Sequence, residues 1–330
     1  MNENTIPKII GVTGGTGYVG SRLISELKRR GHSLICIDIV TPKERNLVLP
    51  AGVEFREHDL RIPAEAEKAL AGVDVVMHLA ADIGSLTYMH DHQAEILVNN
   101  SQIDAAIYPA MVKSGVQHVI YSSSSMVFQY PPKFPYTEDD VEKINPPKNV
   151  YGYSKLSGEY FCRSFYEQYG LPFTILRYHN IYGPGEDSKG ATPGDIHVIP
   201  ALLEKVLVKK QYPLELIGDP ESTRPFTYVD DAVTATAELI DRACLGSKEV
   251  MQEDFNIGND THYTILNLAE KIWSMYGDER TFAFVEVPTR ANTALRREVD
   301  ISKIRDKIGW EPRVTLEEGL PIVAEWIKGR

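Results

Sequence analysis

Two short stretches carry side chains whose types and spacing could do chemistry together. In YGYSK, Tyr151 and Lys155 are four residues apart and would share one face of a helix. An unperturbed phenol has a pKa of about 10, and a nearby lysine cation favours the phenolate, so this pair could remove the proton of a substrate hydroxyl. The serine run 122–125 follows an apolar stretch and offers a further hydroxyl for the same proton transfer. If a nicotinamide ring takes hydride from the same carbon, the chemistry is reversible oxidation of an alcohol.

These side chains need a scaffold, and the first half of the chain predicts a parallel sheet. Short apolar runs alternate there with amphipathic segments such as 18–31 and 64–72. This alternation is typical of a sheet that helices cover on both faces. Strands are expected at 8–14, 33–38, 53–59, 74–80, 118–123 and 173–178. After a loop at 183–195, helices are expected near 198–209, 230–243, 264–276 and 301–308.

A glycine array follows the first expected strand. Gly14, Gly17 and Gly20 have the spacing with which a backbone turns tightly, approaches a pyrophosphate and starts a helix. Asp38 ends the second expected strand, where a carboxylate binds the ribose hydroxyls of an adenosine and repels a 2′-phosphate. The array therefore predicts NAD rather than NADP, against the alternative of a plain glycine-rich turn. The segments 58–60 and 78–81 end later strands at the same edge, where His58 and His78 are interpreted as structural.

Taken together, these motifs resemble the extended short-chain dehydrogenase/reductase superfamily and, within it, the nucleotide-sugar epimerases and dehydratases. Further matching stretches are VNN (98–100), LRYHNIYGPG (176–185), RPFTYVDDAV (224–233), FNIGN (255–259) and IGWEPRVTLEEGL (308–320). The resemblance covers nearly the whole chain. It implies an α/β fold in which a Rossmann-type doubly wound parallel sheet precedes a smaller mixed α/β C-terminal domain. It also implies tightly held NAD and a homodimer formed through a helix bundle.

The expected domain division follows from the same resemblance. Residues 1–180 would form the NAD-binding domain, to which a later segment, about 225–258, crosses back. Residues 181–330 would mainly bind the nucleotide-sugar substrate.

The resemblance also assigns roles to residues at matching positions. Ser124, Tyr151 and Lys155 would be catalytic, with Ser124 relaying the proton of the sugar hydroxyl. The substrate would contact Ser85, Ser124, Asn180, Lys189, Arg224 and Arg290, the two arginines clamping its diphosphate. The cofactor would contact Gly14, Thr16, Gly17, Tyr18, Val19, Gly20, Asp38, Asp59, Leu60, Leu79, Ala80, Ala81, Asn99, Tyr151, Lys155 and His179. For His179 a packing role is the alternative interpretation. One departure from the family pattern is Pro225, where relatives commonly have a small polar or acidic residue.

Composition restricts the class of protein. The chain has 330 residues and a net charge of −11, which argues against nucleic-acid or membrane partners because both require a basic surface. An anionic substrate then needs a local positive site, and Arg224, Arg290, Arg296 and Arg297 are the candidates. The 3 cysteines lack metal-binding or pairing spacing, and the N-terminal stretch has no signal-peptide pattern. A cytoplasmic protein without a metal site is expected.

Residues after Ser124 discriminate between the possible reactions. The 4,6-dehydratases have an Asp-Glu pair there and the related decarboxylases a glutamate, whereas this chain has Ser125 and Met126. Without a second acid or base, hydride return to the opposite face of the 4-keto sugar, a C4 epimerisation, is the expected outcome.

Three alternatives to C4 epimerisation remain open from the sequence. The stretches 79–89 and 177–184 resemble GDP-mannose 3,5-epimerases, and Lys189 could match a lysine acid/base of those enzymes, but their cysteine partner falls at Met126. A thioether exchanges no proton. A 4,6-dehydratase ranks third, and an NAD(H)-binding sensor is the non-enzyme alternative.

Overall fold

The computed structural model describes residues 8–186, 197–288 and 294–330. Its centre is a 7-stranded sheet in which every neighbouring pair runs parallel, in the order β11-β6-β5-β4-β1-β2-β3. The strands are β1 (Ile9–Thr13), β2 (Ser33–Asp38), β3 (Glu54–Glu57), β4 (Val75–His78), β5 (His118–Ser124), β6 (Phe173–Tyr178) and β11 (Glu253–Ile257). The predicted Rossmann-type α/β fold is confirmed.

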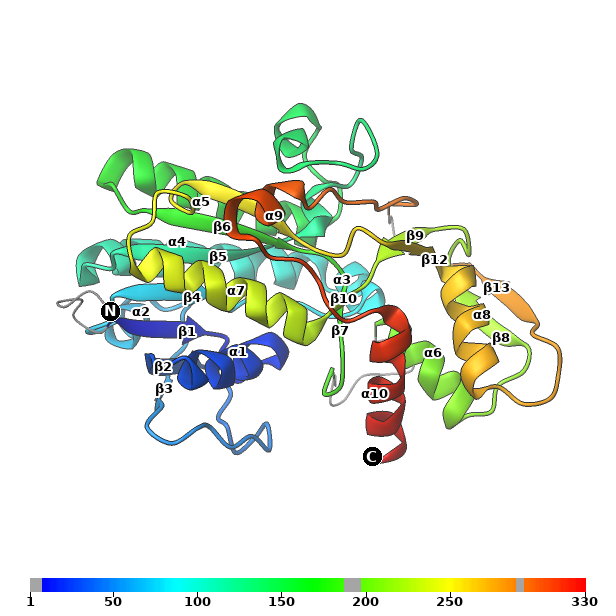
Figure 1. Cartoon of the computed structure of the whole chain (residues 1–330). Coiled ribbons are helices and arrows are strands. Elements are labelled where there is room, and N and C mark those ends of the chain that lie inside the picture. The colour runs from blue at the N-terminus through cyan, green and yellow to red at the C-terminus, as the bar shows by residue number, and fades with distance from the viewer. Residues whose placement is uncertain (1–7, 187–196, 289–293) are drawn as a thin grey trace.

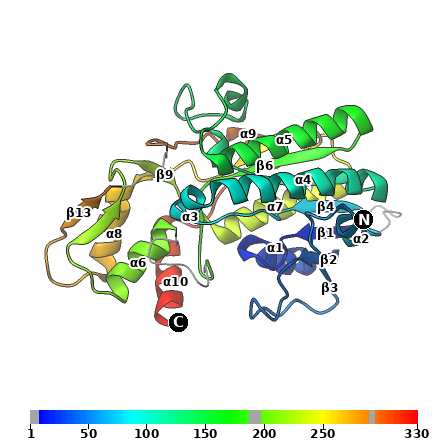
Figure 2. The same ribbon diagram turned by 180° about the vertical axis from the view of Figure 1, so that it is seen from behind.

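Helices cover the sheet on both faces (Figures 1 and 2). On one face lie α1 (Tyr18–Arg29), α7 (Val229–Cys244) and α9 (Ser302–Ile308). On the other lie α2 (Pro63–Ala69), α4 (Gln93–Ser114) and α5 (Val150–Tyr169). A short helix, α3 (Leu86–Asp91), precedes α4, and two 3-10 turns, η1 (Ser125–Val127) and η2 (Glu138–Lys143), lie between β5 and α5. Within the described ranges, none of the helices combines the length and apolar character needed to cross a bilayer.

Strand alternation produces the two layers of core. In β4, Val75 and Met77 pack toward α1 and α7, whereas Val76 between them packs toward α2 and α4. Because both faces of each central strand are covered, its apolar runs are nearly continuous rather than alternating with polar residues. This burial is the main force that holds the sheet edge, and with it the candidate site, in place.

The C-terminal part packs around a separate apolar cluster. It contains α6 (Val198–Leu207), α8 (Ile265–Tyr276) and α10 (Leu316–Lys328), with the short strands β7 (Ile181–Tyr182), β8 (Leu214–Ile217), β9 (Thr223–Pro225), β10 (Thr227–Tyr228), β12 (His262–Thr264) and β13 (Phe284–Val287). These strands form three two-stranded pairs, β10-β7, β12-β9 and β13-β8. In Figure 1 this part lies beyond the carboxyl ends of the long sheet strands, next to α3.

The order of the strands defines where a ligand is expected. The chain moves outward from β1 to β2 and β3, then returns to β4 on the other side of β1. In open α/β sheets, ligands bind beyond the carboxyl ends of the strands at such a reversal. The glycine loop after β1 and the segment after β4 therefore border the expected dinucleotide site.

Candidate active site

The glycine loop is as tight as the sequence predicts. Gly14 has a φ of +66°, and a Cβ added there would lie 2.9 Å from the backbone nitrogen of Ala80. A Cβ on Gly20 would lie 2.3 Å from the carbonyl oxygen of Gly14, so only glycine lets α1 start this close to β1. Gly17 is the N-cap of α1 and has no side-chain cap, which leaves backbone N–H groups at the helix start available to an anion.

Asp38 lies beside this loop at the end of β2. Its carboxylate accepts hydrogen bonds from the Thr16 N–H at 3.1 Å, from the Thr16 hydroxyl at 2.9 Å and from the Val40 N–H at 3.1 Å. The loop and the acidic strand end therefore face the same edge of the sheet. This arrangement fits a dinucleotide with its pyrophosphate at the α1 N-terminus and an adenosine ribose at Asp38.

The other predicted cofactor residues lie just after strands β3 and β4 or on helices α1 and α4. The Leu79 and Ala80 N–H groups both donate to the Thr13 hydroxyl at 3.2 Å, which ties the end of β4 to the end of β1. Asn99 on α4 donates to Asp82 at 2.7 Å and accepts from Arg61 at 3.1 Å. Tyr18, Val19, Asp59 and Ala81 are half-buried along the same edge, and Leu60 is buried.

The serine run continues β5 to its last residue and then enters η1, and each serine meets a different neighbour. The backbone carbonyl of Ser122 accepts from Lys155 Nζ at 2.8 Å, and the Ser123 hydroxyl donates to Glu159 at 2.6 Å. The Ser124 hydroxyl accepts from the Met126 N–H at 3.1 Å. The Ser125 hydroxyl lies 3.5 Å from Nη1 of Arg297. Ser124 is thus the serine whose hydroxyl lies beside Tyr151 rather than inside the scaffold.

Helix α5 carries Tyr151 and Lys155 to this turn. Asn149 caps the helix by accepting from the Gly152 N–H at 3.0 Å. A Cβ on Gly152 would lie 2.4 Å from the Met126 carbonyl oxygen, so glycine lets the first turn of α5 pack directly on η1. Tyr151 is 5% exposed and Lys155 3% exposed, and Lys155 Nζ lies 6.0 Å from the Tyr151 ring centroid.

Burial dominates the electrostatics of this group. It raises the pKa of the Tyr151 phenol, while a hydrogen bond with Ser124 acts in the opposite direction. Burial also lowers the pKa of Lys155 to about 8, and the Asp104 carboxylate opposes that decrease. The Lys155 ammonium donates to the Ser122 carbonyl and lies 6.0 Å from the centroid of the Tyr151 ring, so its effect on the pKa of the phenol stays a prediction. Ser124 is the group that favours the phenolate.

The structure brings together two of the arginines that the sequence suggests for a positive site, Arg224 and Arg297. Arg224 on β9 is half-buried, and burial together with the neighbouring Arg297 cation lowers its pKa to about 9. Arg297 is 6% exposed and lies next to Met126, whose sulfur its Nη2 contacts. Arg296 is exposed and pairs with Glu298 at 2.9 Å, so it does not join this site. Lys189 and Arg290 lie outside the described residues.

Three residues predicted to contact the substrate or the cofactor already form hydrogen bonds within the protein, through the side chain or the backbone. Asn180 is half-buried with a φ of +40°, and its carbonyl accepts from the Thr227 N–H at 3.2 Å. Ser85 caps α3 by accepting from the Tyr88 N–H at 3.1 Å. His179 is 0% exposed, with ring nitrogens 3.4 Å from the Tyr136 hydroxyl and 3.3 Å from Asn256 Oδ1. Burial lowers the pKa of His179 to about 3, so a neutral packing role fits this imidazole better than a ligand contact.

A buried ion network behind the serine turn was not anticipated from the sequence. Arg177 on β6 is 0% exposed and donates two hydrogen bonds of 2.8 Å to Glu159 on α5. It also pairs with Asp254 on β11 at 2.8 Å. The arginine thus joins the edge strand β11 and its neighbour β6 to the helix that carries Tyr151. Among the described residues, no group of histidines, cysteines and carboxylates is placed to hold a metal ion.

The parallel sheet, the glycine loop and the acidic residue after β2 define a dinucleotide-binding α/β protein. Residues 10–258 match the model of the NAD dependent epimerase/dehydratase family, and the chain belongs to that family. It is an NAD-dependent enzyme of the nucleotide-sugar class.

Similar proteins span almost the whole chain. GDP-mannose 3,5-epimerase of Arabidopsis thaliana is 29% identical over 97% of this chain and 82% of its own length. A putative UDP-glucose 4-epimerase of Methanocaldococcus jannaschii is 31% identical over 96% of this chain and 97% of its own. The structure is similar to that of the UDP-glucuronic acid 4-epimerase from Bacillus cereus in complex with UDP-glucuronic acid and NAD, with a TM-score of 0.81, 26% identity and coverage of 97% and 99% of the two chains.

Proposed function

We propose that the protein is a nucleotide-sugar C4-epimerase, in which Ser124 and Tyr151 act on the C4 hydroxyl of a UDP- or GDP-linked sugar. The observation that carries this proposal is the composition of the turn after β5. The Ser124 hydroxyl lies beside the Tyr151 phenol, and the next side chains are a hydroxyl and a thioether, Ser125 and Met126. Neither can act as the additional acid or base that elimination from a 4-keto sugar requires.

The roles of the residues follow from their contacts. Bound NAD supplies a reversible hydride acceptor for the sugar carbon. Ser124 bridges the C4 hydroxyl to Tyr151, and the phenolate receives the proton as the carbon is oxidised. Lys155, held by the Ser122 carbonyl, keeps a cation 6.0 Å from the centroid of the Tyr151 ring and would hydrogen-bond the nicotinamide ribose of bound NAD. When the keto sugar turns its other face, C4 would receive the hydride back from the cofactor while Tyr151 returns the proton to the oxygen through Ser124, so the sugar leaves with inverted C4.

A 3,5-epimerase is the second candidate, because one of the similar proteins carries that name. That reaction needs a proton donor and acceptor on opposite faces of the ring, whereas C4 oxidation and re-reduction need a single shuttle. Met126 is 8% exposed in the cluster that contains Tyr151, and its sulfur cannot carry a proton at neutral pH. The single Ser124–Tyr151 shuttle therefore favours C4 inversion.

Isotope exchange distinguishes the two reactions. We expect that incubation with UDP-glucose, UDP-glucuronate and GDP-mannose in deuterated water gives a C4-inverted product without deuterium on carbon, because the abstracted hydrogen returns to the sugar. Proton NMR measures both the inversion and the deuterium content. Deuterium at C5 of an epimerised product contradicts C4 chemistry, since inversion at C3 or C5 proceeds through enolates. Absence of turnover on the whole panel, with NAD bound, would instead indicate an NAD(H) sensor.

The two-domain division is proposed together with this function. The apolar clusters of the long sheet and of the C-terminal part support it, and β11 (Glu253–Ile257) pairs with β6 as a returning segment would. Residues 1–180 with about 225–258 would bind NAD, and 181–330 would mainly bind the substrate. A reducing, cytoplasmic location is proposed with it, which the free cysteines Cys36, Cys162 and Cys244 support.

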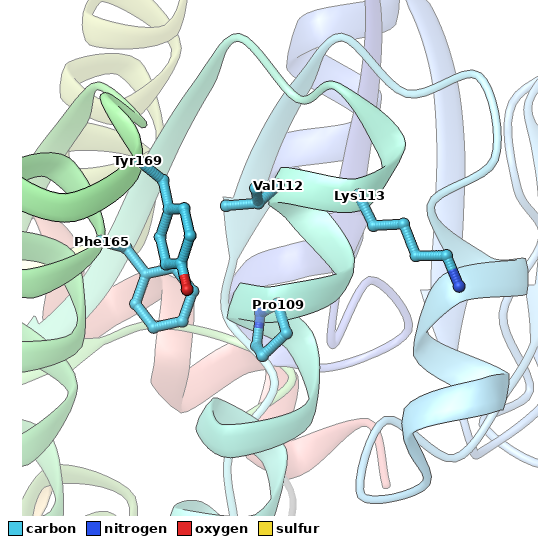
Figure 3. A pocket seen from close by; sticks show the side chains of 5 residues that line it. All are labelled: Pro109, Val112, Lys113, Phe165 and Tyr169. Carbon is cyan, nitrogen blue, oxygen red and sulfur yellow. The ribbon is translucent and has the colours of Figure 1, made fainter.

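A homodimer formed through α4 and α5 is also proposed. These two helices lie side by side and expose Val98, Tyr153, Tyr160 and Tyr169, large apolar side chains that an interface would cover. Figure 3 shows a surface hollow between the two helices, lined by Pro109, Val112, Lys113, Phe165 and Tyr169. Light scattering is expected to give twice the chain mass, and Tyr160→Glu is expected to give the monomer. A wild-type monomer at micromolar concentration would contradict this proposal.

A further inference from the structure

Arg297 differs from the other deeply buried arginine of the protein. Within the described ranges, Arg177 and Arg297 are the arginines that are more than nine-tenths buried. Arg177 is neutralised by the carboxylates of Glu159 and Asp254. Arg297 forms no ion pair with any described carboxylate, and its Nε is buried without a hydrogen-bond partner. One buried guanidinium is therefore part of the scaffold, and the other lacks a counter-ion among the carboxylates that the structure describes.

The position of Arg297 is set by the backbone. Its N–H donates to the Thr223 hydroxyl at 3.1 Å, and Thr223 begins β9. From there the guanidinium reaches η1, with Nη1 3.5 Å from Ser125 and Nη2 on the sulfur of Met126. Met126 packs in the same cluster as Tyr151. The cation is thus one side chain away from the groups that handle the C4 hydroxyl in the proposed function.

An unpaired buried cation is unfavourable for folding. Desolvation of a charge costs free energy that a counter-ion or hydrogen bonds normally offset, and Arg224 adds repulsion nearby. Features that destabilise the folded protein without compensation from neighbouring residues occur at functional sites, where a bound ligand supplies the missing interaction. The missing partner of Arg297 is therefore expected to be an anionic group of the substrate.

We propose that Arg297 binds the carboxylate of a nucleotide-linked uronic acid and so selects uronates over neutral hexoses, an inference that rests on the proposed C4 chemistry. The diphosphate is attached to C1, across the ring from C4, and in this proposal Arg224 binds it. The carboxylate of a uronic acid is attached to C5, next to the reacting carbon. A planar guanidinium binds such a carboxylate with two parallel hydrogen bonds.

Binding titrations on the NAD-loaded protein test this inference. The probes are UDP-glucuronate against UDP-glucose, GDP-mannuronate against GDP-mannose, and UDP and GDP alone. We expect the wild-type protein to bind the uronate of one pair on the order of 10- to 100-fold more tightly than its neutral partner. Arg297→Met should abolish that preference, Arg297→Lys should retain part of it, and Arg296→Met, which removes the adjacent exposed arginine, should leave it intact.

Thermal unfolding separates a ligand contact from a structural role. Removal of an unpaired buried cation should leave the melting temperature of the substrate-free protein unchanged or raise it. Equal wild-type affinity for uronate and neutral sugar overturns the inference. So does an Arg297→Met variant that loses affinity for the free nucleoside diphosphate as much as for the uronate, because the arginine then contacts the diphosphate.

Failure of the inference and failure of the proposed reaction give different results. Selective uronate binding followed by release of carbon dioxide and a pentose keeps the inference and contradicts C4 epimerisation. C4 inversion of a neutral hexose, without any preference for uronates, supports C4 epimerisation and contradicts the inference about Arg297.

Discussion

Replacement of Tyr151 by phenylalanine is expected to lower kcat about 10²- to 10⁴-fold, the usual contribution of a positioned acid or base. The ring is retained, so its packing against Met89, Ile96 and Met126 is retained too. The lost hydroxyl acts only as the sugar proton moves, and the reduction should therefore appear in kcat with little change in KM. Steady-state kinetics on the best substrate of the panel, with bound NAD quantified after denaturation, measures both effects.

Tyr153→Phe is the matched control for Tyr151→Phe. Tyr153 belongs to the same YGYSK stretch, but its side chain is exposed at 48%, away from Ser124. The control should keep wild-type turnover. If Tyr151→Phe also kept more than about a tenth of the wild-type kcat, the phenol could not be the acid/base that the mechanism requires.

The strands of the fold were predictable because burial on both faces makes them continuously apolar. The expected strands 33–38 and 173–178 coincide with β2 (Ser33–Asp38) and β6 (Phe173–Tyr178). Helix α4 was not predicted, although VNN lies within it. Its buried face includes Asn100 and Asp104, which hold Asp82 and His78, and these polar residues interrupt the apolar periodicity on which a helix prediction depends.

The candidate site was predictable where spacing alone determines geometry. Tyr151 and Lys155 share a helix face, and Ser124 ends the strand that the helix packs on. Arg296 and Arg297 show where prediction from the sequence fails, because residue type alone does not tell which of two adjacent arginines is buried. Extended backbone places them on opposite sides, so Arg296 pairs with Glu298 in solvent while Arg297 turns inward with Val299. The alternation of exposed and apolar residues around them is the signal that could have separated them.

The contacts that control proton transfer at Tyr151 could not be predicted from the sequence. A lysine four residues from a tyrosine suggests direct stabilisation of the phenolate. In the structure the Lys155 ammonium is committed to the Ser122 carbonyl, and Ser124 is the residue that acts on the Tyr151 phenol. Which neighbour a side chain meets depends on the turn after β5, and that turn is set by contacts between segments far apart in the chain, such as Gly152 on Met126.

Replacement of Arg177 by methionine is expected to destabilise the protein by about 3–5 kcal/mol, because Glu159 loses its closest cation and keeps only Arg163 at 4.0 Å, while Asp254 keeps Lys303 at 2.7 Å. Glu159 is 1% exposed and would keep a hydrogen bond from Ser123 but lose both bonds from Arg177. The Asp254 carboxyl would lose the largest of the interactions that hold its pKa below the ordinary value against burial. Urea unfolding at neutral pH measures the loss.

The pH dependence of the Arg177→Met variant gives a second signature. In the wild-type protein Arg177 is the largest of the cations that hold the pKa of the Asp254 carboxyl below its ordinary value of about 3.9, and the stability that this shift gives is present at neutral pH and is lost as the pH falls below about 4. The deficit of the variant relative to wild type is therefore largest at neutral pH and shrinks below about pH 4. Arg242→Met, which breaks partly exposed pairs with Glu238 and Glu249, should cost only about 0–1 kcal/mol. Equal losses for the two variants would mean that the buried network contributes no more than a surface ion pair, and that the serine turn is held in place by packing alone.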